Sequence, residues 1–507
     1  MKFLIVGSGA REHAIIENAS RCGYETYAAS DMRNPGLLRL CKEIHLVNIL
    51  DPAAVTAVAA KVRPDIIFVG SEESLFAGVS DALRADGHFV IGASRVAADI
   101  EKSKGFMRKL MEKYEMYGRL RFKTFSNITE ATRYIDEYPG SVAIKPTRQA
   151  GGKGVKVIAD IQTYLKEEKS AAKKQHVSDI VSQNLSQDLE DPILIEERVE
   201  GVEYTLQCFT DGKHIVPLKM VEDHPHAFVE DIGPETGGMG SISGKDENLP
   251  FLSEKDYKVS YEIVEKVVKA IELETGQPYF GVLSGQFMLT DKWGPTVIEF
   301  YSRLGDPETV NIMPQLLNFD DILEGMQNGS LGKVKARFEE KATAVKIIAP
   351  KGYPNLRDIG KGHPLSVDFN AISALGATPY FGSVYEEGGS LYTGGSRAVA
   401  MYAAAETIEP SAEVRTAAAY ALGDVARRAP SGEHGTDLIR GLVGLQEDTV
   451  GDVRAAAIHS LGFATVTKEQ EPVVTAAIKA GVADDFYWAR EAARKSAKAL
   501  NVVVVDA

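Results

Sequence analysis

The sequence predicts an α/β protein of several domains that ends in an all-α tail. The chain has 507 residues, more than one ordinary domain holds. In its first hundred residues short apolar runs alternate with helical segments, which is typical of a parallel sheet covered by helices. After about residue 401 the composition becomes rich in alanine and indicates helices almost throughout.

Three apolar runs predict buried strands near the N-terminus: residues 3–6 (FLIV), 65–70 (DIIFVG) and 89–92 (FVIG). Segments such as residues 11–21 (REHAIIENASR) lie between the strands and have the periodicity of helices. Residues 101–120 continue with helical periodicity and many charges.

The middle of the chain mixes strands and helices. Residues 121–160 are strand-like and rich in glycine, and residues 161–190 are polar and predict helix. The alternation in 193–209 predicts a pair of strands, and 255–276 predicts a long amphipathic helix. Two further strands follow around the turn DKWG, and 345–400 contains short strand-like pieces with many glycines.

The alanine-rich tail repeats itself. Residues 411–423 (SAEVRTAAAYALG), 450–462 (VGDVRAAAIHSLG) and, more weakly, 486–500 share a pattern with arginines at 415, 454 and 490. This spacing is close to that of HEAT-type helical pairs, in which each pair needs a neighbour to cover its apolar face. The alternative is an alanine-rich helical hairpin whose similarity to such repeats is accidental.

Composition narrows the function classes. The net charge of −14 argues against a broad nucleic-acid surface but leaves room for a small phosphorylated substrate. Cys22, Cys41 and Cys208 match neither a zinc site nor a disulfide framework, which fits a reducing compartment. The apolar run at residues 3–6 is too short for a signal sequence or a membrane span, so we expect a cytoplasmic protein without membrane contact.

The stretch 144-IKPTRQAGGKGV-155 combines a lysine at a strand end with a glycine-rich loop. Gly151, Gly152 and Gly154 allow backbone N–H groups to approach an anion, and Lys153 and Lys145 add positive charge. The loop is not a Walker A motif, because no Ser or Thr follows Lys153. It predicts phosphate binding, with a surface hairpin and a solvated lysine as the alternative.

Two further segments place acids and an arginine at strand ends. In 195-IEERVEGVEY-204, Glu203 is a candidate to bind the ribose hydroxyls of a nucleoside, and the backbone of residues 197–199 is a candidate to bind the edge of its base. The alternative is that this segment is a charged β-hairpin without a binding role. In 298-IEFYSRLGDPE-308, Glu299 is placed to bind a hard cation and Arg303 offers a planar fork for a carboxylate or acyl phosphate. The alternative for the GDPE run is a purely structural turn.

The segment 223-DHPHAFVEDIGPETGGMGSIS-243 predicts an extended loop of unusual backbone shape. Its glycines at 233, 237, 238 and 240 are typical of linkers or binding loops. Asp223 and the amides around Gly238 are candidates to hold a small amino acid.

Seven stretches of the chain, in this order, resemble the glycinamide ribonucleotide synthetases of the ATP-grasp superfamily. They are 7-GSGAREHA-14, 70-GSEESLFAGVSDAL-83, 92-GASRVAADIEKSKGFMRKLM-111, the two stretches at 144 and 195, 231-DIGPETGGMG-240 and 299-EFYSRLGDPE-308. The resemblance runs from Met1 to about Met401. It implies a Rossmann-like domain (1–101), an ATP-grasp region (102–335) with a lid at about 121–192, and a small β-rich domain (336–401). The HEAT-like tail (402–507) lies beyond it.

The resemblance also implies a reaction of de novo purine biosynthesis. ATP, with Mg²⁺ or Mn²⁺, would phosphorylate the carboxylate of glycine to glycyl phosphate. The amine of 5-phosphoribosylamine would then attack and give glycinamide ribonucleotide, ADP and phosphate. Such catalysis is mainly positioning and charge neutralisation, with a lid that protects the acyl phosphate from water.

The family's functional positions fall on matching residues of this chain. Lys104 and Lys145 would contact ATP phosphates, with Lys145 and Arg303 catalytic, and the metal would bind Glu299. The lid would comprise Gly151, Gly152, Lys153 and Gly154, and adenine and ribose would contact Glu196 and Glu203. Glycine would contact Asp223, Gly238 and Arg303. Phosphoribosylamine would contact Gly9, Arg11, Glu12, Glu72 and Ser74. Gly394, Gly395 and Arg397 match a stretch of the small C-terminal domain.

The chain departs from the family at several positions. Tyr301 stands where the family has a metal-binding Asn, and a neutral phenol is a poor Mg²⁺ ligand, so metal binding would rest on Glu299, the phosphates and Gln286. Glu235 replaces an Asn, and Pro225 and His226 replace Lys and Arg in many members. The family's final helix and strand are missing, and the alanine-rich repeats begin where they should be.

These departures keep two alternatives open. One is an ATP-grasp carboxylate–amine ligase with another pair of substrates. The other is a weakly catalytic ATP-binding protein whose helical tail, residues 402–507, docks a protein partner.

Overall fold

A computed structural model of the chain describes residues 1–139, 142–146, 156–157, 193–228, 232–291, 293–405, 433–448 and 451–502, the last range without 463, 465, 469, 485 and 501. Three predictions therefore lie outside the described residues: the glycine loop at 151–154, the helix at 161–190 and the first tail repeat at 411–423.

The N-terminal part is the predicted parallel sheet. Its five strands have the order β3-β2-β1-β4-β5 and are all parallel. They are β1 (Lys2–Val6), β2 (Glu25–Ser30), β3 (Glu43–Leu46), β4 (Ile66–Val69) and β5 (Val90–Ile91), and the helices between them are α1 (Ala10–Arg21), α2 (Pro35–Leu40), α3 (Pro52–Val62), α4 (Glu72–Ala77) and α5 (Val79–Ala85). Because β2 and β4 flank β1 on opposite sides, the loops after β1 and β4 form the crevice where such sheets bind ligands.

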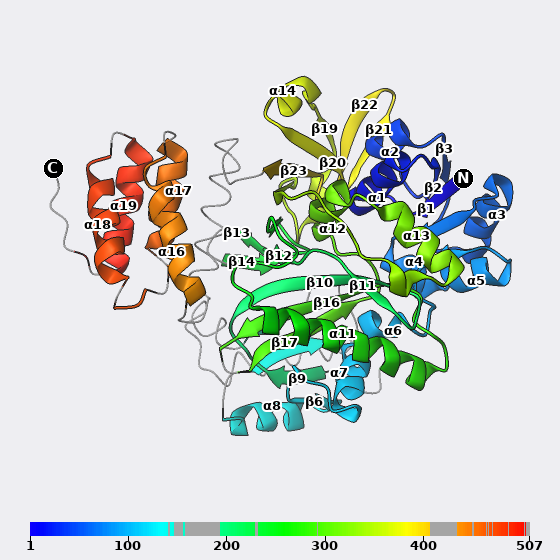
Figure 1. Cartoon of the computed structure of the whole chain (residues 1–507), viewed down its shortest axis with the longest axis horizontal. Helices are drawn as coiled ribbons and strands as arrows, with labels where there is room; N and C mark the ends of the chain where they lie inside the picture. The colour runs from blue at the N-terminus through cyan, green and yellow to red at the C-terminus, as the bar shows by residue number, and fades with distance from the viewer. Residues whose placement is uncertain are drawn as a thin grey trace.

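A nine-stranded sheet forms the centre of the molecule, in the order β17-β16-β10-β12-β15-β18-β23-β20 with β11 beside β10. Its strands are β10 (Val202–Thr210), β11 (Ile215–Pro217), β12 (Val221–Asp223), β15 (Gly240–Ser243), β16 (Gly281–Thr290), β17 (Gly294–Tyr301), β18 (Ala342–Ile348), β20 (Ala377–Phe381) and β23 (Val399–Ala405). The long helix α11 (Glu254–Thr275) lies across β10, β16 and β17 (Figure 1). Helices α12 (Glu308–Ile312) and α13 (Phe319–Asn328) and the 3₁₀ turns η2 (Met313–Gln315) and η3 (Leu331–Lys333) follow β17.

The segment expected as a small C-terminal domain is joined to this central sheet. Strands β18, β20 and β23 continue it through the pairing of β15 with β18. The rest of the segment is a sheet β19 (Lys361–Leu365), β22 (Ser390–Gly394) and β21 (Val384–Glu387), with α14 (Phe369–Ala374) and the turn η4 (Arg357–Gly360). Short β-like pieces were predictable here, but the pairing between β15 and β18 spans about a hundred residues and leaves no local sequence signal.

A smaller antiparallel sheet has the order β6-β9-β7-β8 and lies in the region expected to contain the lid. It comprises β6 (Phe122–Phe125), β7 (Val142–Pro146), β8 (Lys156–Val157) and β9 (Ile193–Glu197), and helix α8 (Ile128–Glu137) packs on it. Helices α6 (Asp99–Lys102) and α7 (Lys104–Lys113) link this sheet to the N-terminal part. The expected extended loop at 223–243 contains a two-stranded hairpin, β13 (His226–Phe228) and β14 (Ile232–Glu235).

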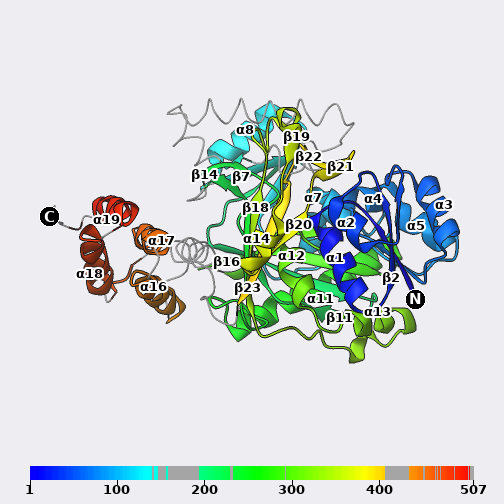
Figure 2. The ribbon, with the colours of Figure 1, turned by 90° about the horizontal axis from the view of Figure 1, so that it is seen from above.

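Residues 402–405 of the predicted tail belong to strand β23, whereas the described part of the tail from residue 433 on is helical, as predicted. Its helices form a group of their own (Figures 1 and 2). They are α16 (Glu433–Leu445), α17 (Gly451–Leu461), α18 (Glu471–Val482) and α19 (Tyr487–Ala499). Two of the repeated arginines meet at one residue: Arg454 makes a paired contact with the carboxylate of Asp484 at 2.8 Å, and Arg490 donates to its carbonyl at 2.7 Å. The HEAT-like assignment and the docking role stay predictions. No helix in the described part of the chain has the length and apolar character to cross a membrane.

Candidate active site

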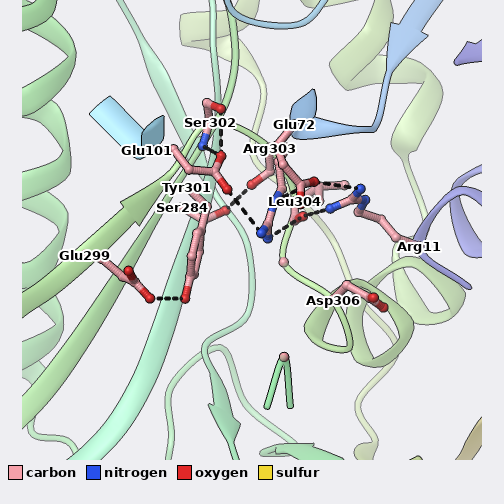
Figure 3. A network of polar contacts seen from close by, with 12 residues as sticks. Arg11, Glu72, Glu101, Ser284, Glu299, Tyr301, Ser302, Arg303, Leu304 and Asp306 are labelled. Atoms are coloured by element: carbon pink, nitrogen blue, oxygen red, sulfur yellow. Dashed lines mark hydrogen bonds and ion pairs between the residues drawn. The ribbon is translucent and has the colours of Figure 1, made fainter. Parts of the chain in front are cut away.

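The end of β17 and the start of α7 bring together a lysine, a glutamate and a tyrosine. Glu299 and Tyr301 are two residues apart on β17, so their side chains share one face of the sheet. Lys104, the first residue of α7, pairs with Oε2 of Glu299. The hydroxyl of Tyr301 donates to Oε1 of Glu299 at 2.6 Å (Figure 3). Burial alone would raise the pKa of Glu299, but the nearby ammonium of Lys104 outweighs it and lowers the pKa to about 2.

A second pair of cations surrounds Glu196 on β9. Lys145 on the neighbouring strand β7 pairs with Oε1, and Arg108 of α7 donates to Oε2 at 2.8 Å. Arg108 is fully buried and also donates to the carbonyls of Val297 and Ile298, both at 2.9 Å. Ile298 is the extra residue of a β-bulge in β17, which frees its carbonyl. Lys145 is held by an acid that is 2% exposed, and its charge also acts on Glu299 of the Lys104 pair.

The strand register places three more polar side chains on the same face. Thr205 lies opposite Gln286, and Gln286 lies opposite Glu299, because β10, β16 and β17 are consecutive neighbours. Gln286 accepts a hydrogen bond from Thr205 and donates to Glu203 at 3.3 Å. Its carbonyl oxygen thus contacts the Thr205 hydroxyl, and the suggested role of Gln286 at a metal stays a prediction.

Arg303 forms the centre of a buried charge network just beyond β17 (Figure 3). Its guanidinium contacts Glu72 at 3.4 Å and Glu101 at 3.2 Å, and its side chain is 11% exposed. Glu101 also accepts hydrogen bonds from the backbone N–H and the hydroxyl of Ser302, both at 2.7 Å. Burial alone would lower the pKa of Arg303, but Glu101 and Glu72 raise it, so the guanidinium stays charged. Sequence reasoning missed Glu101, a single acid in a polar helical stretch that resembles many others.

Asp223 and Gly238, both predicted to meet glycine, lie close together. A Cβ atom on Gly238, whose φ is +100°, would lie 2.7 Å from Oδ1 of Asp223 and 2.6 Å from Pro307. That Oδ1 atom has no hydrogen-bond partner among the described residues. Burial, and then the charges of Glu308 and Glu203, raise the pKa of Asp223 well above its usual range.

Arg397 fixes the backbone at Gly238, beside Asp223. It pairs with the carboxylate of Asp306 at 2.6 Å, donates to the Asp306 carbonyl at 2.6 Å, and also donates to the carbonyls of Gly237 and Gly238. The segment containing Gly394 and Gly395 thus reaches the site through Arg397. The side chain of Glu235 lies outside the described residues, while Pro225 accepts hydrogen bonds from Thr236 at 2.7 Å.

The predicted phosphoribosylamine residues gather at the crevice of the parallel sheet. Arg11 of α1 contacts Glu72 at 3.2 Å and Glu12 at 2.8 Å, and Glu12 accepts from the backbone of Gly9 at 2.7 Å. Glu12 packs where Gly7 and Gly70 leave room, since a Cβ on either would collide with it. Ser74 is fully buried and donates to a backbone carbonyl at 2.9 Å. Glu12 and Ser74 therefore make structural contacts here, and their substrate roles stay predictions.

The donors around Glu299 fit a hard divalent cation that binds together with a nucleotide. Among the described residues, no three His, Cys, Asp or Glu side chains are grouped so that they could hold a metal by themselves. A Mg²⁺ ion in nucleotide sites needs only one or two carboxylates beside phosphates and waters. The carboxylate of Glu299 is 26% exposed and suits that role. The Tyr301 hydroxyl points at Glu299, and its role as a metal ligand stays a prediction.

Known proteins resemble this chain over most of its length. Residues 1–101 match the family model "Phosphoribosylglycinamide synthetase, N domain", and residues 102–309 match "Phosphoribosylglycinamide synthetase, ATP-grasp (A) domain". The chain is 42% identical over 429 residues to the phosphoribosylamine–glycine ligase of Methanopyrus kandleri, covering 82% of this chain and 92% of that protein. It is 41% identical over 443 residues to the enzyme of the same name from Methanocaldococcus jannaschii, covering 85% and 96%.

Solved structures extend the likeness. The phosphoribosylamine–glycine ligase of Thermotoga maritima superposes with a TM-score of 0.65 at 26% identity, covering 82% of this chain and 94% of that one. The biotin carboxylase domain of Hydrogenobacter thermophilus 2-oxoglutarate carboxylase superposes with a TM-score of 0.59 at 13% identity, covering 85% and 90%, and shares the fold alone. The chain belongs to the phosphoribosylamine–glycine ligase family, with an ATP-grasp fold.

Proposed function

We propose that the protein ligates glycine to 5-phosphoribosylamine at the expense of ATP, giving glycinamide ribonucleotide, ADP and phosphate. One observation supports this assignment most directly. The ring of Tyr301, whose hydroxyl contacts Glu299 in the cluster with Lys104, lies against Arg303. The charge of Glu308 acts on both Arg303 and Asp223, whose Oδ1 has no hydrogen-bond partner among the described residues, so groups suited to a nucleotide adjoin groups suited to an amino acid. This adjacency is what a phosphoryl transfer from nucleotide to carboxylate requires.

The nucleotide end would use the lysines that now pair with carboxylates. Lys104 and Lys145 would turn to the phosphates of ATP, while Arg108 continues to neutralise Glu196. A divalent cation, Mg²⁺ or Mn²⁺, would be held by Glu299 and the phosphates and would offset their negative charge. The loop with Gly151, Gly152, Lys153 and Gly154 would cover the phosphates and exclude water.

The amino acid end would use opposite charges for the two ends of glycine. The planar guanidinium of Arg303 suits the carboxylate, and Asp223 suits the ammonium group. A carboxylate oxygen of glycine attacks the γ-phosphorus of ATP and ADP leaves, which gives an acyl phosphate. The amine of 5-phosphoribosylamine then attacks the acyl carbon, loses a proton, and phosphate departs. Arg303 would stabilise the negative charge that builds up on the acyl phosphate.

The test is a coupled assay of ADP release with glycine and freshly prepared 5-phosphoribosylamine. We expect turnover that depends on all three substrates. Lys145→Met should abolish it and weaken ATP binding in calorimetry, because the phosphates lose a positive charge. Unchanged ATP affinity and turnover in Lys145→Met would refute the assignment. Turnover with a different acid but none with glycine would favour another ATP-grasp ligase, the reading that the departures at Tyr301, Glu235 and Pro225 suggest.

A further inference from the structure

Tyr301 makes two different contacts with the two halves of the site. Its hydroxyl donates a hydrogen bond to Oε1 of Glu299 at 2.6 Å. The face of its ring lies 4.4 Å from the centre of the Arg303 guanidinium. One side chain therefore touches both the carboxylate placed for a cation and the arginine placed for the substrate carboxylate (Figure 3).

The hydroxyl fixes the orientation of Glu299. In the structure Oε2 pairs with Lys104 and Oε1 accepts from Tyr301, so both carboxylate oxygens are held. If Lys104 turned to nucleotide phosphates, Oε2 would lose its partner while Oε1 could still accept from Tyr301. The hydrogen bond from Tyr301 would then hold the carboxylate while Oε2 became available to a cation. Hydrogen bonds of this kind to a ligating carboxylate orient it for its metal.

The ring fixes the orientation of Arg303. Glu72 and Glu101 contact nitrogens of the guanidinium, and its central carbon lies over the Tyr301 ring, 4.4 Å from the ring centre. A cation over an aromatic face is held by the quadrupole of the ring, and this hold needs no hydroxyl. The two contacts of Tyr301 therefore depend on different parts of the side chain and can be removed separately.

We propose that Tyr301 is a positioning residue of the ligation, whose hydroxyl aligns Glu299 for the divalent cation and whose ring aligns Arg303 for the carboxylate of the amino acid. The proposal rests on the proposed function for its substrates. It gives the residue that replaces a metal-binding amide a definite role, and it links the two ends of the reacting system through one side chain.

Two substitutions at Tyr301 separate the roles. Tyr301→Phe removes only the hydroxyl, and Tyr301→Leu removes the ring as well. The chain offers a matched control in Tyr114→Phe, because Tyr114 donates to Glu274 at 2.7 Å and Glu274 also pairs with Lys113, the same three residue types away from the site. Binding of Mn²⁺ to the full-length protein in the presence of ADP is measured by the loss of the electron paramagnetic resonance signal of free Mn²⁺. The KM for glycine and kcat are measured by ADP release.

We expect Tyr301→Phe to weaken Mn²⁺ binding about tenfold, which is the lower end of the effects usually caused by removing a hydrogen-bond partner of a metal ligand. The KM for glycine should change less than about twofold, because the ring remains. Tyr301→Leu should weaken Mn²⁺ binding equally and also raise glycine KM about tenfold. Tyr114→Phe should match the wild type in all three measurements. Melting temperatures check that each variant is folded, and Tyr301→Phe, which is nearly isosteric, decides the hydroxyl's role even if Tyr301→Leu is unstable.

Two results would overturn the proposal: Mn²⁺ binding in Tyr301→Phe equal to that of the wild type, or a rise in glycine KM in Tyr301→Phe as large as in Tyr301→Leu. A purely structural role predicts lower melting temperatures without a selective change in Mn²⁺ binding. If the wild type binds Mn²⁺ and ADP yet ligates no glycine, the proposed function fails, while the Mn²⁺ titration still decides the hydroxyl's role.

Discussion

Helix α7 begins and ends with a lysine, and the two lysines meet the same residue types in different surroundings. Lys104 pairs with Glu299, which also accepts a hydrogen bond from Tyr301; we call these three the cleft cluster. At the other end Lys113 pairs with Glu274, which also accepts from Tyr114; we call these the surface cluster. The Lys104 side chain is 12% exposed and that of Lys113 is 63% exposed.

The same three residue types therefore differ in their expected contribution to stability and activity because their burial and the neighbouring charges differ. In the surface cluster water can replace each partner, so the pair adds little to stability. In the cleft cluster the lysine is far less exposed than Lys113, whereas Glu299 and Glu274 are similarly exposed at 26% and 24%. The cleft cluster also lies beside further buried charges, among them Arg108 and Arg303. Removing one group there leaves another charge uncompensated in a poorly solvated place. Such charges are pre-arranged for a ligand that brings the complementary charge.

The largest expected difference concerns activity. Glu299→Gln should lower kcat/KM for ATP-dependent ligation at least about a hundredfold, because the proposed function assigns this carboxylate to the divalent cation that offsets phosphate charge in the transfer. Glu274→Gln, the matched change in the surface cluster, should leave kcat/KM unchanged. Both are measured by ADP release at saturating divalent cation. Equal activity in the two variants would show that the cleft cluster has no special role.

The next difference concerns stability. Arg108→Met should lower the free energy of unfolding by roughly 3–5 kcal/mol, because it leaves Glu196 with one partner and two buried carbonyls without a donor. Lys113→Met removes an ion pair at the surface that is closer, at 2.5 Å against 2.8 Å, and should not shift the urea midpoint measurably. The comparison breaks if the two variants unfold at the same urea concentration.

The pH dependence of stability sharpens the same contrast. Burial alone would raise the pKa of Glu196, but Arg108 and Lys145 outweigh it and lower the pKa from 4.5 to about 2. A carboxyl whose pKa is depressed by folding stabilises the protein fully above its unfolded pKa, and this contribution disappears as the pH falls through its folded pKa. The melting-temperature deficit of Glu196→Gln against wild type should therefore be largest at neutral pH and shrink between pH 4.5 and about 2.

The control for the pH experiment is again the surface cluster. The pKa of Glu274 is also lowered, by hydrogen bonds from Lys113 and Tyr114, so its contribution has the same sign. Because solvent screens it, Glu274→Gln should show a small deficit at every pH. A deficit of Glu196→Gln that stays constant down to acid pH would mean that ionic pairing does not hold this site.

Much of the fold could be predicted from local patterns, since the run at 3–6 became β1 (Lys2–Val6) and that at 65–70 became β4 (Ile66–Val69). The lysines of the candidate site were also recognisable, because Lys145 ends an apolar strand beside a glycine-rich loop. The partners of these groups were not predictable. Lys104 and Glu299 are 195 residues apart, and only the packing of α7 against β17 brings them together.

The same limit explains the residues that sequence reasoning missed. Glu101 and Arg108 lie in a polar helical stretch and have the same appearance there as exposed charges. In the folded chain Arg108 is among the largest fully buried side chains, and Glu101 holds both Ser302 and Arg303. Local periodicity reports which face of a helix is apolar, whereas a buried ion pair depends on charges that arrive from distant strands.

The smallest expected effect tests the surface cluster alone. At low ionic strength Tyr114→Phe and Glu274→Gln should lower the melting temperature slightly or not measurably, and in 1 M NaCl both should equal the wild type, because the screening length is then about 3 Å. The deficit of Arg108→Met should persist in 1 M NaCl, since buried charges are screened much less. If salt removed both deficits alike, solvent would reach Arg108 and Glu196 as freely as it reaches Lys113, and the difference between the two ends of α7 would lie in sequence context instead of burial.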